Sequence, residues 1–382
     1  MIIRNADIYS TDFQFHRGCV RSRGGRIISV SREDIKPEPG EEVIDAEGKD
    51  LIPGMTDEHF HGCMSYDLCD ASQGAIRAMA KWEHSQGVTQ ICPATMTLSE
   101  KKVHAIVKTA YDYAGSQTAR DEARLVGVHM EGPFISPDRV GAQNPEFVHL
   151  PDADFLEKLE DETQNFVRIV TIAPEMEGAI DCIRKLSGRI RFSVGHTMTD
   201  YDTARKAFDA GAGNLTHLYN AMPGIHHRKP GPIAAGWEHG DVFAEIISDG
   251  VHIHPAAIRT AFRLFGAEHM ILISDSTRAA GMDDGQYELG GQPIFKHDGA
   301  AYLSDGTLAG STTSLWECCR NAIRFGIPKE DAIRAATYNP AKSVGILNEY
   351  GTIEAGKCAN MVLSKKDGTI VRVFSGQETE QF

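Results

Sequence analysis

The middle of the chain alternates short apolar runs with longer stretches in which apolar residues recur every three or four positions. Short runs are typical of buried strands, and the longer period is typical of amphipathic helices. Eight runs fit strands, at residues 50–57, 88–95, 124–131, 167–174, 191–196, 213–217, 242–249 and 269–275. Helical patterns lie between them, including 74–87, 99–115, 152–162, 201–212 and 254–267. Eight β-α units over about 225 residues predict an α/β fold, a (β/α)8 TIM barrel.

The alternative for this region is an open, doubly wound sheet. That fold commonly carries a GxGxxG turn after its first strand, and no such motif follows residues 50–57. The barrel is therefore favoured.

Both ends of the chain have a different pattern, in which apolar and polar residues alternate singly between turn signals. Gly-Gly and Asp-Gly pairs interrupt residues 1–50 and 351–376, as expected of turns between antiparallel strands. We predict a small β-sandwich domain built from residues 1–50 and 346–382, and a catalytic barrel domain at residues 51–345.

Composition narrows the class of function. The chain has 39 Lys and Arg against 53 Asp and Glu, a net charge of −14, so its field repels nucleic acid and anionic membrane surfaces. No apolar run approaches the ~18 residues of a membrane span. Eight scattered cysteines without a CxxC motif indicate reduced thiols. We expect a soluble cytoplasmic protein with no nucleic-acid or membrane partner.

Polar residues follow the predicted strands at their carboxyl ends, where the active sites of such barrels lie. His59 and His61 follow the first run, and residues two apart in an extended chain face the same side. The other strand ends carry Glu131, His196, His217 and Asp275. Any one of them alone has an ordinary alternative, as a half-buried side chain or a helix cap. Four histidines and two carboxylates at one rim predict a divalent metal site.

A close family resemblance rests on seven short motifs: PGMTDEHFHG, HMEGPF, VGHT, THLYNAMP, SDGVHIHP, ISDST and TLAGS. With them the sequence resembles the N-acetylglucosamine-6-phosphate deacetylases of the amidohydrolase superfamily over nearly the whole chain. The resemblance implies a (β/α)8 barrel with a small β-sandwich. It also implies metal-dependent hydrolysis of the acetamide of N-acetyl-D-glucosamine 6-phosphate to D-glucosamine 6-phosphate and acetate.

The resemblance implies roles for the strand-end residues. Glu131, His196 and His217 match the ligands of a catalytic divalent ion, and Asp275 matches the general base. A bound ion activates water and polarises the carbonyl, while the carboxylate takes the proton of the attacking water and passes it to the leaving amine.

The number of metal ions is a separate question. Some relatives have Gln-x-Asn where this chain has His59 and His61, and those relatives are associated with one ion. The histidine pair allows a second ion, with Glu131 as the bridge. Zinc is the metal that we expect, with iron as the alternative, because imidazole and carboxylate ligands suit both.

Four matching positions are implied in phosphate binding: Asn220, the main-chain N–H of Ala221, Arg228 and His252. An arginine suits a phosphate dianion because it offers a planar fork of donors. In the family this arginine reaches the neighbouring active site, which implies a homodimer. Gln143 stands where several relatives have histidine, and its amide donates a hydrogen bond to the substrate carbonyl without carrying charge.

Three alternatives remain at this stage. N-acetylgalactosamine 6-phosphate differs from the gluco substrate by the configuration of one hydroxyl, and no motif reads that hydroxyl. Another amide, including a cyclic one, is also compatible with the superfamily. A metal-free scaffold is the remote alternative, because such a protein is expected to have lost metal ligands that this chain retains.

Overall fold

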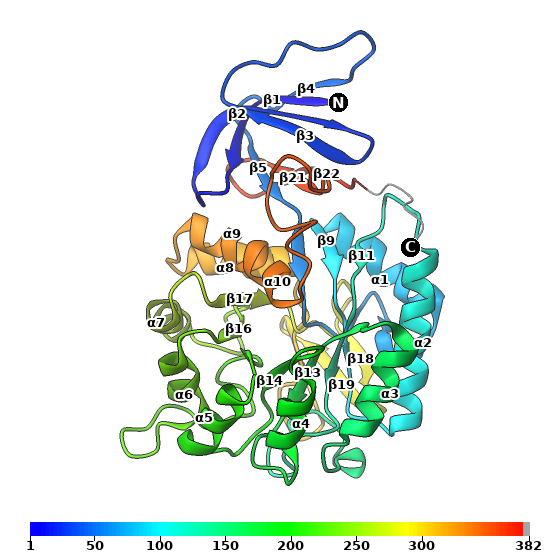
Figure 1. Cartoon of the computed structure of the whole chain (residues 1–382), viewed down its shortest axis with the longest axis vertical. Coiled ribbons are helices and arrows are strands. Elements are labelled where there is room, and N and C mark those ends of the chain that lie inside the picture. Colours follow the sequence, from blue (N-terminus) through cyan, green and yellow to red (C-terminus); the bar gives the residue numbers. More distant parts are fainter. Residues whose placement is uncertain (377–382) are drawn as a thin grey trace.

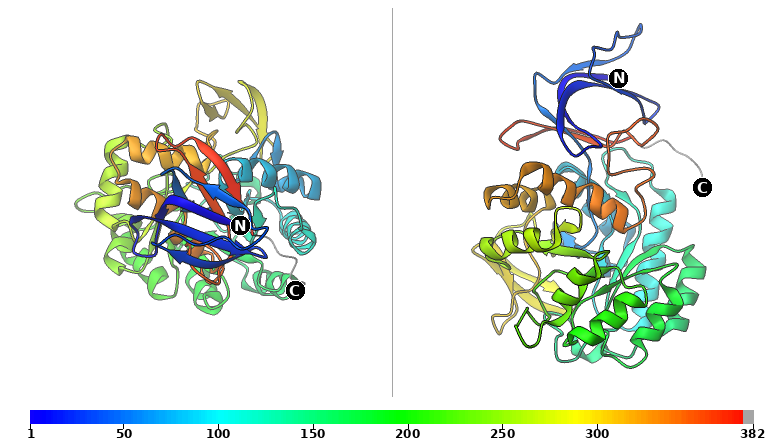
Figure 2. Two further views of the ribbon diagram at one scale, coloured as in Figure 1. Left: turned by 90° about the horizontal axis from the view of Figure 1, so that it is seen from above. Right: turned by 60° about the vertical axis from the view of Figure 1, so that its left-hand side comes forward.

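The computed structural model describes residues 1–376. A barrel lies below a small sheet, and strands from both ends of the chain meet in that sheet (Figure 1). From a second direction the small sheet stands above the barrel as a separate layer (Figure 2). Residues 377–382, the last six of the predicted sandwich segment, lie outside the described residues.

The barrel has eight parallel strand positions. They are formed by β6 (Met55–Asp57), β9 (Val88–Ile91) with β10 (Ala94–Thr95), β12 (Val128–Glu131), β13 (Val167–Ile172), β14 (Arg191–Val194), β15 (Asn214–Leu215), β16 (Phe243–Ile247) and β17 (Met270–Ile273). Ladders join β6 to β9 and run in order from β10 to β17. The last position meets the first, because the Asp275 N–H donates to the His59 carbonyl at 2.9 Å. The predicted (β/α)8 barrel is confirmed.

A helix follows each strand position. These helices are α1 (Gln73–Ser85), α2 (Glu100–Ser116), α3 (Ala153–Thr163), α4 (Ala179–Leu186), α5 (Tyr201–Asp209), α6 (Gly231–His239), α7 (Pro255–Phe265) and α8 (Leu315–Arg324). Side chains of Asp152 and Asp200 cap α3 and α5 by accepting N–H groups of the first turn. Two further helices, α9 (Lys329–Ala336) and α10 (Tyr338–Ser343), end the barrel segment.

Three predicted strands are each split in two. The run at 88–95 breaks at Cys92-Pro93, where proline has no N–H to give to a ladder. The run at 124–131 divides into β11 (Arg124–Leu125) and β12 on either side of Val126-Gly127. The run at 50–57 divides at Gly54 into β5 (Asp50–Pro53) and β6, which belong to different sheets.

The small domain is one curled sheet of seven strands. It contains β1 (Ile2–Tyr9), β2 (Phe15–Arg23), β3 (Arg26–Ser31), β4 (Val43–Asp45), β5, β21 (Met361–Ser364) and β22 (Ile370–Phe374). Its two ends enclose an apolar core that includes Ile8, Val20 and Met361. β3 also exchanges main-chain hydrogen bonds with residues 356–359, so the sheet closes on itself as a small sandwich. The exact domain boundaries stay a prediction.

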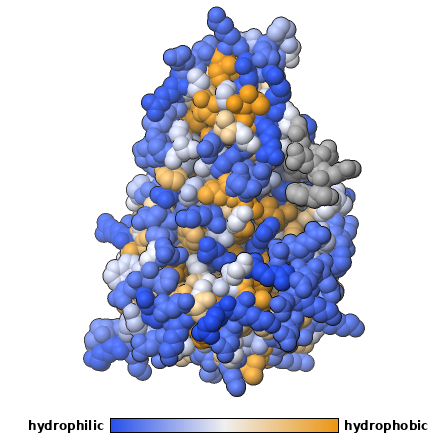
Figure 3. All heavy atoms as spheres, in the orientation of Figure 1, coloured by the Kyte–Doolittle hydropathy of each residue, from blue (hydrophilic) through white to orange (hydrophobic). Residues whose placement is uncertain are grey.

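The small sheet packs on the barrel through α9 and α10. The Tyr9 hydroxyl donates to the Glu330 carbonyl at 2.6 Å, and the Phe13 ring lies edge-on to Tyr338 at 5.0 Å between centroids. On the face shown in Figure 3, apolar side chains gather over the small sheet, whereas much of the barrel below is hydrophilic. Within residues 1–376, no helix combines the length and apolar character needed to cross a membrane.

An insertion follows the last barrel strand. It is a three-stranded antiparallel sheet of β18 (Gly285–Leu289), β19 (Gln292–His297) and β20 (Ala300–Tyr302). A short hairpin follows β6. It consists of the two-residue strands β7 (Gly62–Cys63) and β8 (Tyr66–Asp67). Both additions extend from strands whose ends carry predicted site residues.

The turn at Gly54 requires a residue without a side chain. A Cβ there would lie 1.9 Å from Oγ1 of Thr89. The Thr89 side chain is buried, and its short length leaves it no room to move away. We expect Gly54→Ala to lower the free energy of unfolding by about 1–3 kcal/mol through overpacking. Gly115→Ala is the control, because a Cβ at that exposed position in α2 meets no atom within 4 Å. Gly115→Ala should leave the free energy of unfolding unchanged or raise it slightly. Urea titration followed by circular dichroism measures the stability of both variants. Equal losses in the two variants would contradict the prediction.

Candidate active site

The predicted site residues come together at the carboxyl ends of the barrel strands. His59 and His61 follow β6, Glu131 ends β12, and His196, His217 and Asp275 follow β14, β15 and β17. All six are less than a tenth exposed. His196, His217 and Asp275 adopt left-handed backbone conformations, with φ of 46°, 29° and 47°. Such conformations cost energy for residues other than glycine, and they mark strand ends whose chain direction changes at the site.

The Glu131 carboxylate lies at the centre of the first group. Its Oε1 is 3.2 Å from Nε2 of His196 and 3.1 Å from Nε2 of His217, and the two nitrogens are 3.0 Å apart. Nδ1 of His196 donates to the Arg139 carbonyl at 2.8 Å, so its Nε2 presents a lone pair to the group. Gln143 donates its amide to the other oxygen of Glu131 and accepts the Thr97 N–H.

The second group, His59, His61 and Asp275, also contacts Glu131. Nε2 of His61 is 3.2 Å from Oε2 of Glu131 and 3.4 Å from Oδ1 of Asp275. Nε2 of His59 is 3.3 Å from Oε1 of Glu131 and 3.8 Å from Oδ1 of Asp275. Glu131 therefore contacts imidazoles from both groups, as a bridging carboxylate would.

The electrostatics of the site favour positive charge. Burial alone lowers the pKa of His61, but its hydrogen bonds with Asp275 and Glu131 outweigh burial and raise that pKa to about 10. Burial alone raises the pKa of Glu131, and the imidazoles of His59 and His196 reverse this and hold it well below its usual value. The pKa of Asp275 is lowered in the same way, against burial, by His61 and His59. Both carboxylates are charged at neutral pH, and they attract protons or a metal cation.

The donor set fits a divalent metal ion. Zinc–nitrogen bonds of about 2.0–2.1 Å in a tetrahedron separate neighbouring ligand atoms by about 3.4 Å. The three separations among Glu131, His196 and His217 are 3.0–3.2 Å. Two other groups of potential ligands, His59–His61–Asp275 and His59–His129–Glu245, have their ligand atoms within 4.8 Å of one another. Imidazole and carboxylate donors suit zinc and iron alike.

A cavity of about 440 Å³ lies over the cluster. Nine of the eleven predicted site residues line it, namely His61, Glu131, Gln143, His196, His217, Asn220, Ala221, His252 and Asp275. His59 is fully buried behind the lining, and Arg228 is exposed on a loop away from it. The guanidinium of Arg228 contacts Nε2 of His227 at 2.7 Å.

One predicted substrate-binding residue is held by a neighbouring carboxylate. Oδ2 of Asp249 accepts Nδ1–H of His252 at 2.7 Å, and its Oδ1 accepts the His252 main-chain N–H at 2.9 Å. Burial lowers the pKa of His252, but the Asp249 interactions exceed that effect and raise it. The His252 imidazole lines the cavity, and its raised pKa favours the protonated form, which can donate a hydrogen bond to an anion.

Sequence reasoning missed several residues of the site. Glu245, inside β16, is fully buried and contacts Nδ1 of His59 at 2.9 Å. His129, two residues before Glu131, is fully buried beside His59 with ring centroids 4.4 Å apart. A charged residue inside the apolar run VFAEIISD was the available signal for Glu245. Asp138 and Arg139 line the cavity from an irregular loop. The sequence of this loop has no periodic pattern from which their place at the cavity could be predicted.

Comparisons with known proteins agree with the geometry. Residues 51–378 match the amidohydrolase family. The chain is 35% identical to the N-acetylglucosamine-6-phosphate deacetylase of Bacillus subtilis (strain 168), over 97% of this chain and 94% of the relative. It is 34% identical to the N-acetylgalactosamine-6-phosphate deacetylase of Escherichia coli O157:H7, over 84% and 85%.

A solved structure is similar over the full length. It is a mutant N-acetyl-D-glucosamine-6-phosphate deacetylase from Mycobacterium smegmatis in complex with N-acetyl-D-glucosamine-6-phosphate. The TM-score is 0.91 at 31% identity, with 99% of this chain and 98% of that chain covered. The chain therefore belongs to the amidohydrolase family. Within that family it belongs with the N-acetylglucosamine-6-phosphate deacetylases, as its motifs indicated, and it is a hydrolase.

Proposed function

We propose that the protein hydrolyses the acetamide of N-acetyl-D-glucosamine 6-phosphate to D-glucosamine 6-phosphate and acetate. The observation that carries this proposal is the pair of ligand groups around Glu131, with the Asp275 carboxylate beside them at the base of a cavity. The relatives at 35% identity and the full-length structural similarity support the substrate. A metal-free scaffold is disfavoured, because every predicted ligand is present and turned toward the site.

In this proposal Glu131, His196 and His217 would hold the catalytic divalent ion. His59 and His61, with Glu131 beside them, would hold a second ion, and zinc is the metal that we expect. When bound, such an ion lowers the pKa of water and polarises the substrate carbonyl. Neighbouring residues orient these side chains. The Arg139 carbonyl fixes the tautomer of His196, and Gln143 forms hydrogen bonds with both Glu131 and the Thr97 N–H.

Asp275 acts as the general base. Its lowered pKa keeps it ionised at neutral pH, despite its burial, and its carboxylate borders the cavity. It takes a proton from the attacking water as the water oxygen bonds to the acetamide carbon. The carbon–nitrogen bond then breaks, and the same proton passes from Asp275 to the leaving nitrogen. The Gln143 amide helps to orient the carbonyl.

The phosphate is bound in the same cavity by Asn220, the Ala221 N–H and His252. All three line the cavity, and the contact of His252 with Asp249 favours its cationic form. We infer that Arg228 adds a fourth contact in the active site of a second protomer, because it is exposed and lies outside the cavity of its own chain. The functional unit is then a homodimer. A cytoplasmic location suits eight unpaired thiols and a charged sugar phosphate.

N-acetylgalactosamine 6-phosphate is the second candidate substrate. The 34% identity to the Escherichia coli enzyme that bears this name is nearly equal to the identity with the gluco relative. The metal ligands, the base and the phosphate contacts serve both epimers equally. Side chains that face the sugar ring decide between them.

The first test is acetate release from purified protein. We expect rapid release from N-acetylglucosamine 6-phosphate, and release slower by tenfold or more from the galacto epimer and from unphosphorylated N-acetylglucosamine. An enzymatic acetate assay on the three sugars in parallel measures this. Fast release from the galacto epimer alone would favour the second candidate, and no release from metal-loaded protein would exclude both.

Asp275→Asn tests the general base. An amide has nearly the shape of the carboxylate but accepts no proton at neutral pH, so we expect kcat to fall by about 10²–10⁴-fold. The content of bound metal should stay within twofold of the wild type, measured by elemental analysis of the same sample. Activity near the wild-type level would remove Asp275 from this role.

Arg228→Ala tests the phosphate contact across the dimer. We expect KM for the phosphorylated sugar to rise about 10–100-fold, the effect of losing one charge-assisted hydrogen bond of about 1.5–3 kcal/mol. Lys229→Ala is the control, since this neighbouring cation is also exposed.

Complementation decides which protomer the arginine serves. Mixed dimers of Arg228→Ala and Asp275→Asn chains contain one site with an intact base and an arginine from the partner subunit. We expect this mixture to recover activity with the wild-type KM. A mixture that keeps only the high KM of Arg228→Ala would mean that Arg228 serves its own chain or none.

A further inference from the structure

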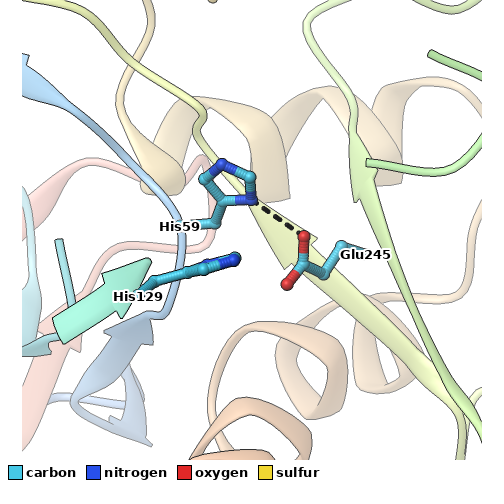
Figure 4. A group of neighbouring side chains, drawn as sticks. All are labelled: His59, His129 and Glu245. Carbon is cyan, nitrogen blue, oxygen red and sulfur yellow. Dashed lines mark hydrogen bonds and ion pairs between the residues drawn. The ribbon is translucent and has the colours of Figure 1, made fainter. Parts of the chain in front are cut away.

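His59, His129 and Glu245 form a completely buried group next to the active site (Figure 4). They come from the segment after β6, from β12 and from β16, and their potential ligand atoms lie within 4.8 Å of one another. None of the three lines the cavity. The group therefore contacts no substrate, and its effect on the reaction must pass through other residues.

The group is not itself a metal site, because His129 has no free ligand atom. Its Nδ1 lies 3.1 Å from the Glu58 carbonyl, which only accepts, so Nδ1 carries the proton. Its Nε2 then accepts from the Thr171 hydroxyl at 2.8 Å. This neutral ring packs against His59, with centroids 4.4 Å apart, and limits where His59 can turn.

Glu245 fixes the other side of His59. Its Oε2 accepts Nδ1–H of His59 at 2.9 Å, as Figure 4 shows, and also accepts the main-chain N–H of His217 at 3.2 Å. The Nδ1 hydrogen bond commits the lone pair of His59 to Nε2. That atom faces Glu131 and Asp275 and has no hydrogen-bond partner within residues 1–376. A carboxylate behind a histidine ligand both orients the ring and makes it a better donor.

We propose that Glu245 is a positioning residue that holds His59 as a ligand for a second divalent ion and ties it to the His217 strand end. The inference rests on the proposed function for its metal, but it assigns a role to a residue that touches neither metal nor substrate. One carboxylate oxygen joins the segment after β6 to the segment after β15, across the barrel interior. Replacing this carboxylate by an amide weakens the hold on the His59 ring, whereas the amide oxygen can still accept the His217 main-chain N–H and the side chains of Glu131, His196 and His217 keep their mutual contacts.

The test is a zinc titration of metal-stripped protein against a chromophoric chelator. We expect two equivalents for the wild type. In Glu245→Gln the weaker equivalent should bind about 10–100-fold less tightly, the usual effect of losing such a partner, and the tighter one should change by less than threefold. Glu160→Gln is the control, because Glu160 is equally buried but accepts the Val167 N–H far from any predicted ligand. Its two affinities should match the wild type.

A double-mutant cycle separates positioning from a general structural effect. In a His59→Gln background, Glu245→Gln should cause no further loss of zinc affinity, because both changes remove the same ligand. Should Glu245→Gln fail to fold, Glu245→Asp, which shortens the carboxylate by one methylene, is expected to weaken the same equivalent. Unchanged zinc affinities in the folded variants, equal losses in both backgrounds, or a single equivalent in the wild type would overturn the proposal. Acetate release plays no part in this readout, so failure of the proposed substrate leaves the result interpretable.

Discussion

The Glu131 carboxylate is the interaction on which the rest of the site depends. Buried at the end of β12, it lies within 3.1–3.3 Å of imidazole nitrogens from three other strand positions. A buried carboxylate is stable only when its charge is compensated, and here the compensation comes from histidines that the barrel brings to one point. The histidines reach Glu131 only when the barrel strands are in place, so the cluster forms together with the barrel. Left-handed backbone at His196 and His217 is tolerated because the surrounding strands and this charge hold it in place.

The small sheet has a mechanical relation to this site. β5 belongs to the small sheet and β6 to the barrel, with only Gly54 between them, so the strand that leads to His59 directly follows a strand of the terminal domain. β21, from the other end of the chain, pairs with β5 residue by residue from Asp50 to Pro53. Strands from both ends of the chain, β1 and β21, therefore pair with β5, which directly precedes the first barrel strand. This explains physically why a domain without site residues accompanies the catalytic barrel.

The sequence predicted the barrel because its signals are local. Each strand is a compact apolar run, and barrel topology alone determines that the run ends share a rim, so His61, Glu131 and Asp275 could be grouped without a structure. Tertiary contacts could not be read in the same way. The bond of Glu245 to His59 joins residues 186 positions apart, and nothing in the spacing of either motif announces it. The exposed position of Arg228 likewise depends on a loop conformation that periodicity does not encode.

The loop before Gln143 carries a constraint on how this enzyme changes over evolution. Arg139 and Gln143 line the cavity, yet the carbonyl of the first anchors His196 and the amide of the second anchors Glu131. A mutation in this wall that reshapes the cavity therefore also disturbs the contacts of His196 and Glu131. Leu289, in the insertion after β17, and Leu308, which follows that insertion, line the same cavity. Inherited variation in substrate choice should therefore accumulate in that insertion, while the loop with Arg139 changes slowly.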